Sequence, residues 1–101
     1  MTDARTVPTH GGRVVLELAS TSPEAVVYAA SLHTESASFT GEVRIVLATG
    51  EVVFAPWQPA EPPGWLLTFA RAFLRSAWLA RREADGEPWP HRINRWRAEK
   101  A

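Results

Sequence analysis

Hydrophobic residues recur at helical spacing over residues 62–82, which read PPGWLLTFARAFLRSAWLARR. At about 100° per residue, the segment divides into an apolar and a polar face. The apolar face comprises Leu66, Leu67, Phe69, Ala70, Phe73, Leu74, Ala77 and Trp78, and the polar face comprises Thr68, Arg71, Arg75 and Arg82. Pro62 and Pro63 favour a helix start, because proline presets φ and has no N–H to leave unpaired there. The pattern predicts a long amphipathic helix over residues 62–82.

The apolar face of this helix covers about half of its circumference, and Trp65 and Leu79 extend it around one flank. A surface helix usually needs an apolar stripe only a little wider than ~100°. One sheet does not cover so broad a face. We therefore expect a second element of the chain, or a partner, to pack on the flank.

Alternating apolar and polar residues predict strands before the helix. The pattern is present in residues 13–19 (RVVLELA), 42–48 (EVRIVLA) and 51–54 (EVVF). Gly50 permits a tight turn between the last two segments. With Thr49 and Gly50 as the loop, Leu47 would pair with Val52 and Ile45 with Phe54, which keeps all four side chains on one face.

Residues 20–36, STSPEAVVYAASLHTES, fit two structures. Ser22, Pro23 and Glu24 resemble a helix start. Against this, strand-forming and apolar residues alternate from Val26 to Leu32. We favour the strand, and the helix remains as the alternative, which would give the element order βαββα.

The sequence thus predicts an α+β fold, in which an antiparallel meander of about four strands is covered on one face by the long helix. A chain of 101 residues suits a single domain over residues 1–101. Within it we expect a loose leader (1–12), a sheet half (13–57), the main helix (62–82) and a C-terminal arm (88–101).

The C-terminal arm contains tryptophan and arginine. Trp89 lies between two prolines and should be extended. Ile93 and Trp96, spaced i and i+3, predict a last helical turn or two. A helix this short needs a surface to lie on, since isolated helices below ~12 residues are marginal. We expect it to pack on the flank at Trp65 and Leu79, with Trp89 and Trp96 as structural anchors.

The chain contains no cysteine, which excludes disulfides and thiolate chemistry. No apolar run reaches the ~18 residues of a transmembrane helix, and the first residues lack a signal pattern. The sequence therefore predicts a cytoplasmic protein with no membrane partner. It has no phosphate-binding loop, dinucleotide fingerprint or nucleophile elbow, so we expect no cofactor.

The formal net charge is zero, but the two signs are unevenly distributed. The chain before Trp65 carries three basic and seven acidic residues, and the remainder carries eight basic and four acidic residues. We expect the arginine-bearing segments to lie near an acidic sheet. The alternative is a basic surface for an anionic partner.

The surplus of tryptophan favours a noncatalytic interaction module that binds another protein or a second copy of itself, because tryptophan and arginine are enriched at interface hot spots. The predicted binding residues are Trp57, Arg71, Arg75, Arg92, Arg95 and Trp96. Of the tryptophans, Trp57 and Trp96 are those expected at the surface.

Two other functions fit the sequence less well. The arginines and tryptophans of the C-terminal region could bind single-stranded nucleic acid, but zero net charge and a pI of about 6.8 argue against a dedicated nucleic-acid binder. A small enzyme could use His33 and Glu35 as an acid–base pair. The pattern is more typical of a polar strand end that leads into a turn.

Overall fold

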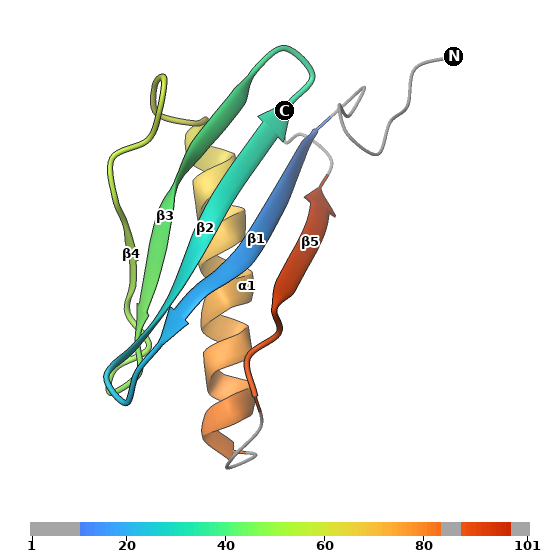
Figure 1. Ribbon diagram of the computed structural model, residues 1–101. Coiled ribbons are helices and arrows are strands. Elements are labelled where there is room, and N and C mark those ends of the chain that lie inside the picture. Colours follow the sequence, from blue (N-terminus) through green and yellow to red (C-terminus); the bar gives the residue numbers. More distant parts are fainter. Residues whose placement is uncertain (1–10, 84–87, 98–101) are drawn as a thin grey trace.

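The computed structural model describes residues 11–83 and 88–97, which form a five-stranded antiparallel sheet and one long helix, an α+β fold (Figure 1). In chain order the elements are β1 (Gly12–Thr21), β2 (Ala25–Thr34), β3 (Ser38–Val46), β4 (Val52–Phe54), α1 (Gly64–Glu83) and β5 (Arg92–Arg97). Their order across the sheet is β4-β3-β2-β1-β5, so a four-stranded meander gains β5 at the outer edge of β1. Residues 1–10 of the expected leader and residues 98–101 of the expected arm lie outside the described residues.

The segment that fitted both a strand and a helix is the strand β2. It pairs with β1 on one side and with β3 on the other, so its backbone is satisfied by two neighbours. The Ser22 hydroxyl accepts hydrogen bonds from the backbone N–H groups of Glu24 at 3.3 Å and Ala25 at 3.1 Å. The residues that resembled a helix cap therefore close the turn between β1 and β2.

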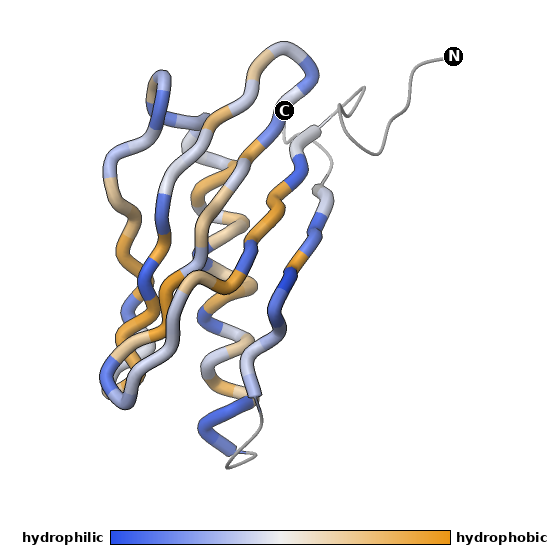
Figure 2. Tube along the Cα trace, in the orientation of Figure 1, coloured by the Kyte–Doolittle hydropathy of each residue, from blue (hydrophilic) through white to orange (hydrophobic). Residues whose placement is uncertain are grey.

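The core lies between α1 and the sheet face next to it (Figure 1). Four helix residues are buried at a spacing of four: Leu66, Ala70, Leu74 and Trp78. The sheet contributes Val14, Leu16, Val26, Tyr28, Ala30, Leu32, Phe39, Val43, Ile45, Val52 and Ile93. Figure 2 shows the matching alternation of apolar and polar positions along the strands. The wide apolar face predicted for the helix is buried only along this stripe, and Phe69 and Phe73 flank it half-buried.

The hairpin between β3 and β4 differs from its predicted register by two residues. Ile45 pairs with Val52, and Val43 pairs with Phe54. The loop is longer than expected, and the Gly50 N–H donates to the Val46 carbonyl at 2.7 Å. A shift of two preserves which side chains face the helix, so the hydrophobic pattern permits both registers.

The longer turn forms a docking site for Trp78. Its indole Nε1 donates a hydrogen bond to the Leu47 carbonyl at 2.8 Å. Its ring lies against Gly50, where an added Cβ would come within 2.5 Å of the ring carbon Cε3. Gly50 also has a φ of 78°, which glycine adopts without strain. The tryptophan and the glycine together explain the size of the loop.

The predicted helical turn in the C-terminal arm is wrong, because residues 92–97 form β5. This strand pairs antiparallel with β1, with Leu16 opposite Ile93 and Arg13 opposite Trp96. A strand satisfies the backbone groups at the edge of β1, which a helix would leave unpaired. The segment therefore extends the sheet instead of packing on α1 as a helix, and Leu79 remains 45% exposed.

We predict that Gly50→Ala lowers the free energy of unfolding by about 2 to 4 kcal/mol, because it combines an unfavourable positive φ with overpacking against Trp78. Urea unfolding followed by tryptophan fluorescence measures the change. The matched control is Gly64→Ala, where a new Cβ meets nothing within 4 Å. This control should change the free energy by less than about 1 kcal/mol. Equal effects of the two substitutions would contradict the docking of Trp78 on Gly50.

Candidate binding site at the β4 edge

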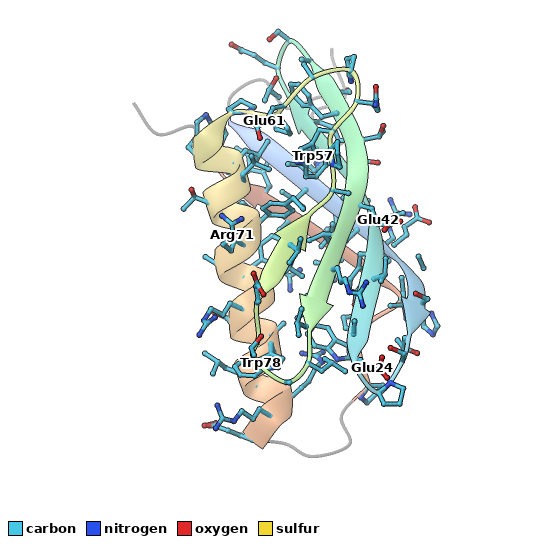
Figure 3. All side chains as sticks on the ribbon, turned by 90° about the vertical axis from the view of Figure 1, so that its left-hand side faces the viewer. Glu24, Glu42, Trp57, Glu61, Arg71 and Trp78 are labelled. Carbon is cyan, nitrogen blue, oxygen red and sulfur yellow. The ribbon has the colours of Figure 1, made fainter. Side chains whose placement is uncertain are left out.

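A groove runs along the outer side of β4, between this strand and α1. One hollow of about 770 Å³ is lined by residues 51–57 together with Glu61, Leu67 and Arg71. A second hollow, of about 460 Å³, is lined by residues 49–52, Arg71 and Arg75. The two share Glu51, Val52 and Arg71, and we call them together the β4 groove. Figure 3 looks onto this side of the molecule.

Two residues of β4 direct their backbone N–H and C=O groups away from β3, toward the outer edge of the sheet. The Val46 N–H donates to the Glu51 carbonyl and the Ala55 N–H to the Glu42 carbonyl, both at 2.9 Å. Hydrogen-bonded and non-bonded pairs alternate along an antiparallel ladder. The N–H and C=O groups of Val52 and Phe54 therefore point outward, and no strand among the described residues lies beyond them.

Trp57 forms the floor of this groove and is not the surface side chain we expected. It is only 9% exposed and belongs to the hydrophobic core. Its ring covers Gly41, where a Cβ would approach ring carbon Cε3 to 2.6 Å. It also lies 5.7 Å from the ring of Phe54, between centroids. The expectation of an exposed Trp57 is wrong.

An irregularity in the strand pairing turns Trp57 inward. The register of β3 with β4 would place Thr40 opposite Trp57, but Thr40 instead exchanges two 2.8 Å hydrogen bonds with Gln58. The chain after β4 thus contains one extra residue, a β-bulge that changes the side to which Trp57 points. Its indole Nε1 is buried without a hydrogen-bond acceptor among the described residues.

Aromatic rings hold arginines along the side of α1 that faces β4. The guanidinium carbon of Arg71 lies 4.8 Å from the centroid of the Phe54 ring. Those of Arg75 and Arg82 lie 5.9 Å and 5.5 Å from Trp78. Contacts of this kind contribute about 0.5–1 kcal/mol at exposed sites. They position a row of positive charge next to the groove.

The β4 groove carries both signs of charge. Glu51 and Glu61 line it together with Arg71 and Arg75, and all four side chains are exposed. Within the described part of the chain, no ion pair joins these carboxylates to the arginines. The expected docking of arginines by charge on an acidic sheet is thus replaced, for Arg71 and Arg75, by contacts with aromatic rings.

The other three predicted binding residues lie on β5, at the opposite edge of the sheet. Arg92 and Trp96 face away from the helix, and Trp96 is 53% exposed as expected. Arg95 lies on the other face of the strand, 6.0 Å from the ring of Phe73. The six predicted residues therefore form two separate groups and do not converge on one site.

The entry to β5 is fixed by Trp89, which was expected as an anchor, together with Tyr28 and Arg81, which were not. The Tyr28 hydroxyl donates to the Pro90 carbonyl at 2.7 Å, and the Trp89 ring meets Tyr28 edge-on at 6.4 Å. Arg81 stacks over Trp89 at 4.7 Å. Burial raises the pKa of Tyr28 above its ordinary value of 10.0, against the opposing charge of Arg81, so the hydroxyl remains a donor. Trp89 is the anchor that we expected, whereas Trp96 is not.

His33 and Glu35 do not form the acid–base pair considered from the sequence. His33 Nδ1 lies 2.9 Å from the Ser38 hydroxyl, across the β2–β3 hairpin. Glu35 is exposed in the turn between these strands. Burial, and secondly the charge of Arg13, lower the pKa of His33 below its ordinary value of 6.5. The arrangement fits a neutral imidazole that bonds its neighbouring strand.

Within residues 11–83 and 88–97, no three histidine, aspartate or glutamate side chains gather to hold a metal ion. No helix in these ranges has the length and apolar content needed to cross a membrane.

We predict that the His33 imidazole titrates below pH 6.5 in an NMR titration of its Cε1 proton, and that Arg13→Gln moves the midpoint upward by removing a nearby positive charge. Arg44→Gln is the control and should leave the midpoint unchanged, because Arg44 is exposed and pairs with Val27, six residues along β2 from His33.

The difference between the folded-state and unfolded-state pKa of His33 decides how the folding stability changes with pH. Because the folded-state pKa is depressed, the unfolded chain binds this proton first as the pH falls below about 6.5, and the native state loses stability. His33→Gln should reduce that loss. A midpoint at or above 6.5 would contradict the assignment.

Comparison with known proteins finds no family model, no curated protein and no solved structure that matches this chain.

Proposed function

We propose that this chain is a noncatalytic protein-interaction module that associates through an open edge of its sheet. The observation that carries the proposal is the outward-facing backbone of Val52 and Phe54, which opens into the β4 groove. Unpaired N–H and C=O groups at a sheet edge are a template for an added strand.

The side chains around this edge support a protein as the partner. The groove combines the aromatic ring of Phe54 with Leu67 and the guanidinium groups of Arg71 and Arg75. Aromatic residues and arginine are enriched at protein interfaces. Alternate side chains of an added strand would contact this wall while its backbone pairs with β4.

Self-association is the form of this function that the purified chain can test. We predict that light scattering on the eluting protein gives a mass rising from 11.2 kDa toward twice that value as the concentration increases from about 1 µM to about 1 mM. Salt should weaken the association only modestly, because paired backbone groups contribute much of it. A mass of 11.2 kDa at every concentration would count against self-association.

Nucleic-acid binding through the C-terminal segment has weaker support. Arg92 and Arg95 project from opposite faces of β5, so these two arginines do not share one basic surface. We predict no salt-sensitive change in the fluorescence anisotropy of labelled single-stranded DNA at low ionic strength. Tight binding that weakens steeply with salt would reverse the preference between these two functions.

A further inference from the structure

The two edges of the sheet differ in charge. The β4 edge has two carboxylates, Glu51 and Glu61, and two guanidinium groups, Arg71 and Arg75. A contact between two identical copies around a twofold axis places a patch against itself. A patch with both signs can complement itself in this way.

The β5 edge has the opposite property. Its described side chains include Arg92 and Arg95 and no carboxylate. Two copies paired at this edge would bring like charges together, which is unfavourable for directly opposed residues. Of the two edges of the sheet formed by the described residues, only β4 has the composition that a symmetric contact requires.

We propose that a second copy of this chain pairs with β4 in antiparallel orientation, with the twofold axis passing through Val53. This inference rests on the proposed function and adds its partner, its surface and its register. The result is a ten-stranded sheet that continues across the two subunits, since each contributes five strands.

The backbone selects this register. With the axis at Val53, Val52 lies opposite Phe54 of the partner subunit and Phe54 lies opposite Val52 of the partner subunit. All outward N–H and C=O groups of these residues then form hydrogen bonds. Both neighbouring registers fail to achieve this.

An axis through Val52 would place Phe54 opposite Gly50, whose N–H already donates to the Val46 carbonyl at 2.7 Å. An axis through Phe54 would place Val52 opposite Pro56, which has no N–H. The turn at one end and the proline at the other therefore leave one antiparallel register with every outward group paired.

The side chains agree with the same axis. Val53 points to the face away from the helix and is 41% exposed, one of three large hydrophobic residues exposed to this extent in the described chain. At the axis it would meet its own copy in a non-hydrogen-bonded pair, where Cα atoms lie about 4.5 Å apart. The exposed valine would become an apolar contact.

Cysteine cross-linking tests the axis directly, because the chain has no cysteine of its own. Val53→Cys should form an intermolecular disulfide under mild oxidation, since a Cα separation of about 4.5 Å lies within the permitted range. The controls are Ala29→Cys, which is exposed on a central strand, and Trp96→Cys at the β5 edge. Both should remain largely uncross-linked at the same protein concentration.

A charge exchange at the same position provides an independent measurement. Val53→Lys and Val53→Glu each place like charges opposite one another at the axis, so each homodimer should dissociate about ten-fold more readily. An equimolar mixture of the two variants should restore association to at least the wild-type level. Circular dichroism and urea unfolding of each variant check that the exposed substitution leaves the fold intact.

The outcomes separate this inference from the proposed function. A wild-type dimer that cross-links at Val53→Cys, with rescue in the mixture, supports both. A wild-type dimer that cross-links through Trp96→Cys and not through Val53→Cys overturns the β4 axis and leaves self-association standing. A monomer at every concentration overturns the second copy as the occupant of the groove.

Discussion

Large side chains that rest directly on glycine backbone are the constraint on which the rest of this structure depends. Trp57 covers Gly41 and Trp78 covers Gly50, and in each case an added Cβ would lie within 2.6 Å of a ring atom. The first contact ties the segment after β4 to β3. The second ties the C-terminal half of α1 to the turn before β4. A strand of only three residues, Val52–Phe54, is thereby held at both ends, and no described strand lies beyond its outer edge.

The elements of the fold were more predictable than their pairing. Period-two and period-3.6 patterns identified the strands and α1, because side-chain direction alone decides which residues face a common core. The β3–β4 register was missed by two residues, since such a shift leaves every side chain on its face. The β5 strand was missed for another reason. Among its described side chains only Ile93 is buried, so the segment carries too little periodicity to separate a strand from a helical turn, and pairing with the edge of β1 decided the outcome.

The candidate site was predictable only in part. Arg71 and Arg75 follow from the helical wheel, which places them on the polar face. Trp57 was expected at the surface as one of a surplus of tryptophans, but it is buried. Its burial depends on a bulge between Ala55 and Gln58 and on the lack of a side chain at Gly41, and neither is visible without the pairing partner. The amino-acid sequence does not show which backbone groups lie at a sheet edge, so the strand order was needed to find them.

The short outward-facing segment of β4 limits the size of the assembly that this edge can support. Long flat edges recruit further strands without limit, and proteins avoid this with short edge strands, prolines and charges. Here Pro56 and the turn at Gly50 restrict the outward backbone to Val52 and Phe54. The β5 edge, with Arg92 and Arg95, disfavours a second symmetric contact. With the proposed contact at β4 and like charges at β5, the chain would form a closed pair, because growth beyond two subunits would need both edges to accept a neighbour.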